Sequence, residues 1–151
     1  MTPSMQNQEL APSTLAELVA LAESDNNRLA VRYEPAFPLD QQTINKCKSA
    51  NHCNEATAII LCRMSFGKYQ MMAYNLYLYR YEKCVFEFVD SDNDQLSQFL
   101  NFIAARNINY TLDEILHDTP KMNNFAKHYN GNAQQYSAHL LETYKNAGGV
   151  L

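Results

Sequence analysis

The sequence predicts a mainly α fold, with at most a small β element. Capped segments in which apolar residues are spaced by three and four recur along the chain, as in residues 94–106. Only one segment, residues 29–34, alternates in the way a short strand does. Hydrophobic residues make up 46% of the 151 residues, enough for a packed core without staples. We therefore expect a flexible leader at residues 1–12 and a single helix-dominated domain over residues 13–151.

Capping residues and turn-forming residues set the expected helix boundaries. Thr14, followed three residues later by Glu17, has the spacing of a capping box. The turn-forming residues 24–27 end that helix soon after Glu23. Residues 84–89 are aromatic and β-branched, which fits a strand or a buried loop. Helices are expected over residues 15–23, 41–50, 55–64, 70–81, 94–106, 112–117, 119–128 and 134–146.

Residues 65–75 connect two apolar segments and contain one of only four glycines in the chain. Gly67 predicts a backbone with positive φ, or a close approach by another group. Ser65 is expected to cap the helix that follows. Apolar residues at positions 71–79 would cover most of that helix, so we expect it to be largely buried. Gln70 must then find hydrogen-bond partners or face a cleft.

The charge pattern excludes some partners. The net charge is −4 and no run of Lys or Arg is long enough to follow a phosphate backbone, so nucleic acid is not expected. No apolar stretch approaches ~18 residues, so stable membrane insertion is not expected either. The start of the chain lacks a basic and then apolar signal-peptide pattern, which predicts synthesis in the cytoplasm without a signal peptide.

Four cysteines without a signal peptide are expected to be reduced thiols. The nearest approach to a zinc motif is formed by Cys47, His52 and Cys53, but no second ligand pair with finger-like spacing follows. We expect neither a metal site nor another cofactor. The four histidines stand in no recognisable motif with a serine or cysteine, which disfavours a cysteine protease or amidase.

Three segments resemble one family and occur in that family's order. Residues 21–24 (LAES) resemble its Glu-Ser pair, residues 65–75 (SFGKYQMMAYN) resemble its Ser-aromatic-Gly-x-x-Gln-Ile-Met segment, and residues 125–131 (FAKHYNG) resemble its Phe-Ala-x-x-Tyr-Asn-Gly. The family is the phage-type N-acetylmuramidases, or endolysins. Goose-type lysozymes and soluble lytic transglycosylases of the lysozyme-like superfamily are more distantly similar. The resemblance extends over roughly residues 15–144 and implies a lysozyme-like fold.

The resemblance implies a metal-free glycosidase that cleaves the bond between N-acetylmuramic acid and N-acetylglucosamine in bacterial peptidoglycan. Its catalytic acid would be Glu23. The end of a helix disfavours a negative charge there, which suits a carboxyl group that must carry a proton. The alternatives are a lytic transglycosylase with the same acid, or a non-catalytic glycan-binding or tail structural module. Without the resemblance, Glu23 would be read as an exposed glutamate at a helix end.

The resemblance also suggests residues for substrate binding, and each has a structural alternative. Ser65 could instead cap the following helix, Gln70 could cap a buried turn, Tyr129 could belong to the core, and Asn130 could form part of a helix C-cap. Glu34 could be a second carboxylate at the site, or it could orient a neighbouring arginine or backbone amide.

The implied setting is phage lysis or cell-wall penetration. The enzyme would be made in the host cytoplasm and would act on the cell wall in the periplasm. A holin, a virion or a secretion apparatus could deliver it.

Overall fold

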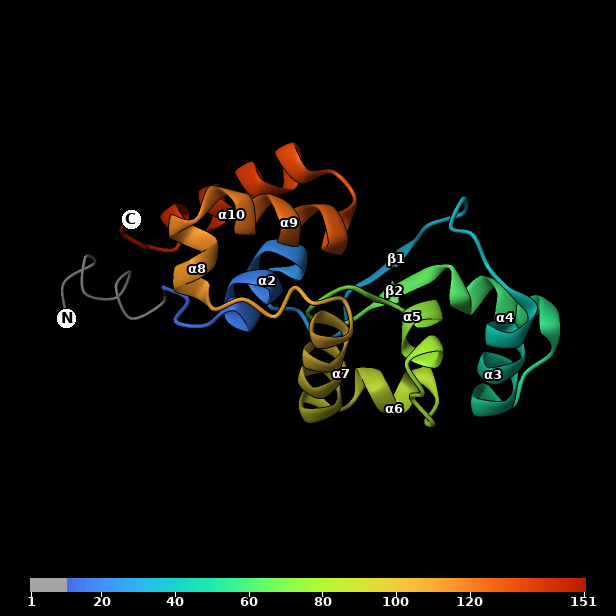
Figure 1. Cartoon of the computed structure of the whole chain (residues 1–151). Coiled ribbons are helices and arrows are strands. Elements are labelled where there is room, and N and C mark those ends of the chain that lie inside the picture. Colours follow the sequence, from blue (N-terminus) through green and yellow to red (C-terminus); the bar gives the residue numbers. More distant parts are fainter. Residues whose placement is uncertain (1–10) are drawn as a thin grey trace. The chain divides into compact units, whose positions relative to one another are not determined.

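The computed structural model describes residues 11–151, so most of the predicted leader lies outside the described residues. The described chain is dominated by helices and contains one small sheet, as predicted (Figure 1). It forms two compact units: residues 11–22 with 103–151 (unit 1), and residues 23–102 (unit 2). Both boundaries fall within continuous helices, and the single domain over residues 13–151 stays a prediction. Among the described helices, none is long and apolar enough to cross a membrane.

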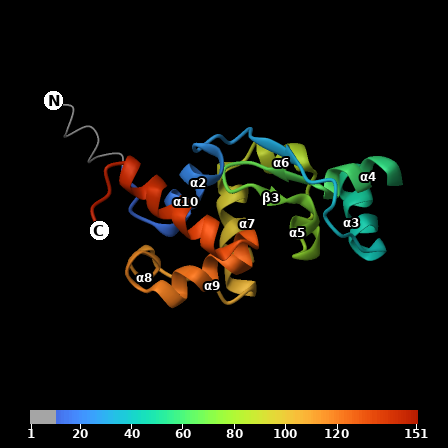
Figure 2. The same ribbon diagram turned by 90° about the horizontal axis from the view of Figure 1, so that it is seen from above.

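The sheet of unit 2 has three antiparallel strands in the order β1-β2-β3, and Figure 2 shows β3 leading into α5. The strands are β1 (Val31–Tyr33), β2 (Met64–Phe66) and β3 (Met71–Met72). Strand β1 confirms the extended segment expected at residues 29–34. In the register, Arg32 lies opposite Ser65, and Ser65 lies opposite Met72.

The hairpin formed by β2 and β3 corrects the prediction for residues 65–75. Ser65 is a strand residue and not a helix cap, and the helix expected from Gln70 begins only at Ala73, as α5 (Ala73–Leu78). Gly67, at φ +83°, and Gln70, at φ +51°, turn the chain back on itself. A short, densely apolar run fits a buried strand as well as a buried helix, so spacing alone gave the wrong element.

The other elements of unit 2 are helices. The segment 84–89, expected to be a strand or a buried loop, is instead the short helix α6 (Val85–Val89), which buries Val85 and Phe88 three residues apart. One helical turn is too short for its periodicity to stand out from β propensity. The remaining helices are α3 (Gln41–Asn51), α4 (Glu55–Cys62) and α7 (Asp92–Ala105), the last of which continues into unit 1.

Unit 1 is helical throughout its described part. Its elements are α2 (Leu15–Ser24), whose last two residues belong to unit 2, with α8 (Leu112–His117), α9 (Thr119–Asn130) and α10 (Ala133–Asn146). The predicted cap of α2 is confirmed, since the Glu17 N–H donates to the Thr14 hydroxyl at 3.1 Å. Leu18, Phe125 and Leu140 are fully buried in the core.

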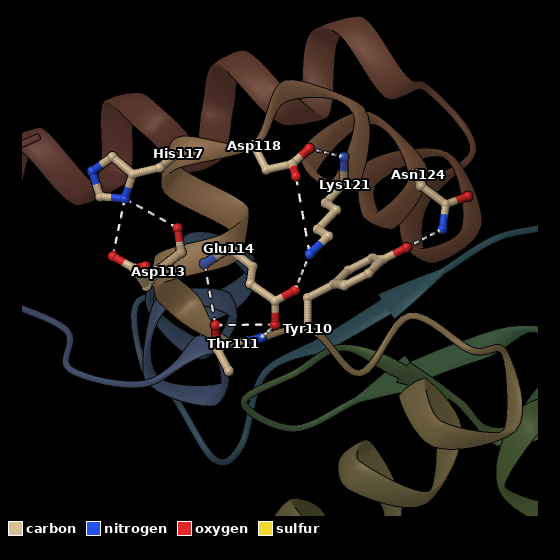
Figure 3. A network of polar contacts seen from close by, with 8 residues as sticks. All are labelled: Tyr110, Thr111, Asp113, Glu114, His117, Asp118, Lys121 and Asn124. Carbon is tan, nitrogen blue, oxygen red and sulfur yellow. Dashed lines mark hydrogen bonds and ion pairs between the residues drawn. The ribbon is translucent and has the colours of Figure 1, made fainter.

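A polar network fixes the turn between α8 and α9 (Figure 3). Thr111 and Glu114 form a capping box at the start of α8, and Asp118 caps α9 by accepting the Lys121 N–H at 3.1 Å. The Lys121 ammonium group also donates to the Glu114 carboxylate, and this hydrogen bond is the main reason why the pKa of Glu114 is lowered. Both helices therefore start from side chains that the sequence places at their N-termini.

Candidate active site

Glu23 is the second-last residue of α2, and only 9% of its side chain is exposed. The helix ends here because Asp25 and Asn26 adopt left-handed backbone conformations, at φ +54° and +60°. The guanidinium group of Arg32 on β1 lies 3.9 Å from the Glu23 carboxylate, at the outer limit of an ion pair, and the Arg32 side chain is 53% exposed. Glu23 is thus a nearly buried carboxyl group at a helix C-terminus, rather than an exposed surface glutamate.

A hydrogen bond ties the end of α2 to the β2–β3 hairpin. The Ser24 hydroxyl donates to the backbone carbonyl of Lys68 at 2.7 Å, and it accepts the Asn27 N–H at 3.1 Å. Lys68 follows Gly67 in the hairpin turn. The residue beside Glu23 is therefore anchored to a second element and is not left at a fraying helix end.

Ser65 and Gln70 come together inside the same hairpin. The Ser65 hydroxyl donates to the Gln70 side-chain oxygen at 2.8 Å. The Gln70 amide nitrogen donates to the carbonyls of Gly67, at 2.9 Å, and of Ala30, at 3.2 Å. Both polar atoms of the Gln70 side chain thus stabilise the turn, which is the structural role that the sequence offered as an alternative to substrate binding. A direct contact of Ser65 or Gln70 with substrate stays a prediction.

Other carboxylates near Glu23 in the sequence have different surroundings. Glu34 follows β1 and is half-buried, and its backbone N–H donates to the carbonyl of Arg63 at 2.7 Å. Asp40 caps α3 by accepting the Thr43 N–H at 2.8 Å, and it accepts the Tyr74 hydroxyl at 2.6 Å. The hydrogen bond from Tyr74 is the main cause of the lowered pKa of Asp40. Asp40 is therefore committed to a structural role.

Tyr129 and Asn130 lie at the end of α9 in unit 1. The half-buried Tyr129 ring stacks on Phe125, with 5.2 Å between ring centroids, and on Tyr136, with 6.0 Å. Asn130 is exposed, and Gly131, at φ +93°, caps α9. The helix C-cap suggested by the sequence is thus present, and substrate contacts of Tyr129 and Asn130 stay predictions.

Comparison with known proteins decides the family. Residues 8–147 match the family model for N-acetylmuramidases. The chain belongs to this N-acetylmuramidase family. It is also 30% identical, over 139 residues, to a protein named as the endolysin of Enterobacteria phage PRD1, covering 85% of this chain and 93% of that protein. No solved structure matches. The muramidase is therefore a glycoside hydrolase that acts on peptidoglycan, and not a non-catalytic module.

The muramidase offers no clustered metal ligands within residues 11–151, where no group of three or more His, Cys, Asp or Glu side chains could hold an ion. Cys47 is buried, with its sulfur 3.7 Å from the carbonyl oxygen of Ala58. His52 ends α3 with its backbone at φ +50°.

A cavity of about 790 Å³ in unit 2 is lined by residues that include Lys46, Tyr77 and Arg80, from α3, α5 and the loop after α5. Neither Glu23 nor any predicted substrate-binding residue lines it.

One residue of the site was not singled out by the sequence. Gln95 on α7 is fully buried and its carboxamide oxygen accepts the Lys68 N–H at 2.8 Å, in the turn that also anchors Ser24. The sequence could have indicated its burial, because Gln95 shares a helix face with the buried residues Phe99 and Phe102, four and seven positions later. A glutamine on an apolar face indicates a buried polar contact.

The fit between Gly67 and Gln95 leads to a stability prediction. A Cβ on Gly67 would lie 2.4 Å from the Gln95 side-chain oxygen, and φ is +83°. Gly67→Ala should therefore lose roughly 1–3 kcal/mol through backbone strain, with a further loss through this collision. Gly131→Ala is the matched control, because φ is +93° there but nothing lies within 4 Å of the added atom.

Urea unfolding of the two glycine variants measures the difference. Gly67→Ala should lower the midpoint more than Gly131→Ala. Equal midpoints would contradict the close fit between Gly67 and Gln95.

Proposed function

We propose that the muramidase cleaves the β-1,4 bond between N-acetylmuramic acid and N-acetylglucosamine, with Glu23 as the general acid. The observation that carries this proposal is the position of Glu23: a side chain only 9% exposed, at the C-terminus of α2, beside a guanidinium group 3.9 Å away. Membership of the N-acetylmuramidase family supports the same reaction class.

The surroundings of Glu23 suit an acid that gives up its proton during the reaction. The bond breaks when the leaving oxygen takes a proton from a carboxylic acid while positive charge develops on the sugar ring. Burial and the negative end of the α2 dipole both favour the protonated carboxyl group before the reaction. Arg32 favours the carboxylate that remains afterwards, and its attraction is weakened by water because its side chain is half-exposed.

The sugar contacts belong to the proposal as well. The half-buried ring of Tyr129, held by stacking on the buried rings of Phe125 and Tyr136, would pack against a sugar ring, with Asn130 next to it in the chain. Ser65 and Gln70 would act mainly through the hairpin that they stabilise. We propose that Glu34, half-buried after β1, also faces the substrate.

Hydrolysis uses a second carboxylate, which either holds water on the opposite face of the sugar from the acid or attacks the sugar itself to form an intermediate that water then cleaves. Of the three carboxylates near Glu23 in the sequence, Asp40 is occupied by Thr43 and Tyr74, which leaves Asp25 and Glu34. We propose hydrolysis because the matched family consists of muramidases. In a lytic transglycosylase, the sugar's own hydroxyl group would replace water and no second carboxylate would be needed.

The proposed setting is bacterial lysis or wall penetration by a phage, because the similar PRD1 protein is named an endolysin. The enzyme would be made in the host cytoplasm and would reach its substrate in the periplasm. A holin, a virion or a secretion apparatus would provide the route.

Replacing Glu23 tests the proposed acid. Glu23→Gln keeps the size and polarity of the side chain but cannot donate the proton, so its rate on purified Gram-negative sacculi should fall at least ~100-fold. Glu142→Gln on α10 removes an exposed carboxylate and should leave the rate unchanged. Circular dichroism should show the same helix content for both variants. Full activity of Glu23→Gln would show that Glu23 is not the general acid.

The products distinguish the two reaction types. Mass spectrometry of digested sacculi should show muropeptides that contain the added water, as hydrolysis requires. Either Asp25→Asn or Glu34→Gln should then reduce the rate if that carboxylate holds the water. Products lighter by one water would instead identify a lytic transglycosylase.

A further inference from the structure

Gln95 connects three segments of unit 2 that are far apart in the sequence. Its side chain is completely buried. The carboxamide oxygen accepts the Lys68 N–H at 2.8 Å, and the nitrogen donates to the carbonyls of Val89, at 3.0 Å, and Arg28, at 3.2 Å. These partners lie in the hairpin turn, at the end of α6 and in the loop that follows Glu23. One side chain therefore holds the surroundings of the acid together.

Only a carboxamide of this length can make these three contacts. One partner of Gln95 is a donor and two are acceptors, so the side chain must present one acceptor and two hydrogens. Glutamate would place a carboxylate against the two carbonyls, and methionine would leave all three backbone groups without their partner. Buried backbone groups of this kind are almost always paired, so losing Gln95 must shift these segments or admit water.

The hairpin turn is shaped to receive this side chain. Gly67 has no Cβ, and an added one would lie 2.4 Å from the Gln95 oxygen and 2.7 Å from its carboxamide carbon. The glycine therefore allows the turn to pass directly against the amide. Its own N–H donates to the carbonyl of Ala30 at 2.8 Å, which binds the same turn to the start of β1.

The contacts of Gln95 lead directly to Glu23. Lys68 is held on its N–H by Gln95 and on its carbonyl by the Ser24 hydroxyl, at 2.7 Å. Arg28, the carbonyl partner of Gln95, lies five residues after Glu23 in the same loop. We infer that Gln95 is a positioning residue for Glu23, acting through Lys68 and Ser24. The inference rests on the proposed role of Glu23 as the general acid.

A positioning role predicts a specific kinetic defect. A proton donor must lie within hydrogen-bond reach of the leaving oxygen, and a displacement of about 1 Å can cost roughly 100-fold in rate. Gln95 is completely buried, so we do not expect it to touch substrate. Its loss should therefore reduce turnover at saturating substrate and leave substrate binding nearly unchanged.

Gln95→Met tests the inference, because it keeps the length of the side chain and removes its hydrogen bonds. The turnover rate on saturating sacculi should fall roughly 10- to 100-fold, and the half-saturating sacculus concentration should change less than about threefold. Gln42→Met makes the same chemical change at an exposed position of α3, in the same unit, and should be indistinguishable from the wild type. Rates are compared below the unfolding midpoint of each variant. An unchanged turnover rate for Gln95→Met would overturn the inference.

The combined variant separates positioning from a general structural effect. If Gln95 acts only through the acid, Glu23→Gln with Gln95→Met should be no less active than Glu23→Gln alone. A further loss of tenfold or more would show an effect independent of Glu23 and would overturn the inference. If Glu23→Gln is itself fully active, Glu23 is not the general acid and the proposed function is contradicted. An inactive Glu23→Gln with an unaffected Gln95→Met contradicts the positioning role alone.

Ser24→Ala provides a second test if Gln95→Met does not fold. This variant removes the contact between the end of α2 and the Lys68 carbonyl and leaves Gln95 in place. It should lower the turnover rate with the same small change in half-saturation. A wild-type turnover rate for Ser24→Ala would contradict the inferred connection from Gln95 to Glu23 through Lys68 and Ser24.

Discussion

The buried carboxamide of Gln95 is the constraint on which the arrangement around Glu23 depends. A buried amide with three satisfied hydrogen bonds stabilises the fold only while all three partners stay in place. Gln95 therefore couples three segments, so that moving one of them alone would break a buried hydrogen bond. These segments are the hairpin turn, the end of α6 and the loop after α2. Gly67 completes this constraint, because any larger residue would push the turn away from the amide. On our proposal, the position of Glu23 is set by packing and hydrogen bonds outside the helix that carries it.

The carboxyl groups of the muramidase differ in their hydrogen-bond partners and in their burial. Asp40, Asp94 and Glu114 accept hydrogen bonds from side chains, above all from Tyr74, Lys83 and Lys121, which lower the pKa of each carboxyl. These groups are structural anions that cap helices or join segments. Glu23 lies at the C-terminus of α2, and only 9% of its side chain is exposed to water. This burial at a helix end is the basis on which we propose Glu23, and not one of the helix-capping carboxylates, for proton transfer.

Sequence patterns predicted the local features of the fold but not the contacts that assemble the site. The cap of α2 at Thr14 and the positive φ of Gly67 follow from residue type and local spacing, and both are present. The β2–β3 hairpin was missed because apolar residues on both faces carry no distinguishing period. The role of Gln95 was missed because its partners lie at positions 28, 68 and 89, and only the folded chain brings them together.

The central claim is that Glu23 faces the glycosidic oxygen of the substrate. A crystal structure of the Glu23→Gln variant with a bound peptidoglycan fragment tests it directly, because the variant keeps the shape of the site and should not consume the ligand. The bridging oxygen should lie within about 2.6–3.2 Å of the side chain at position 23, the reach required of a general acid. A fragment bound with its β-1,4 linkage next to a different carboxyl group would contradict the account.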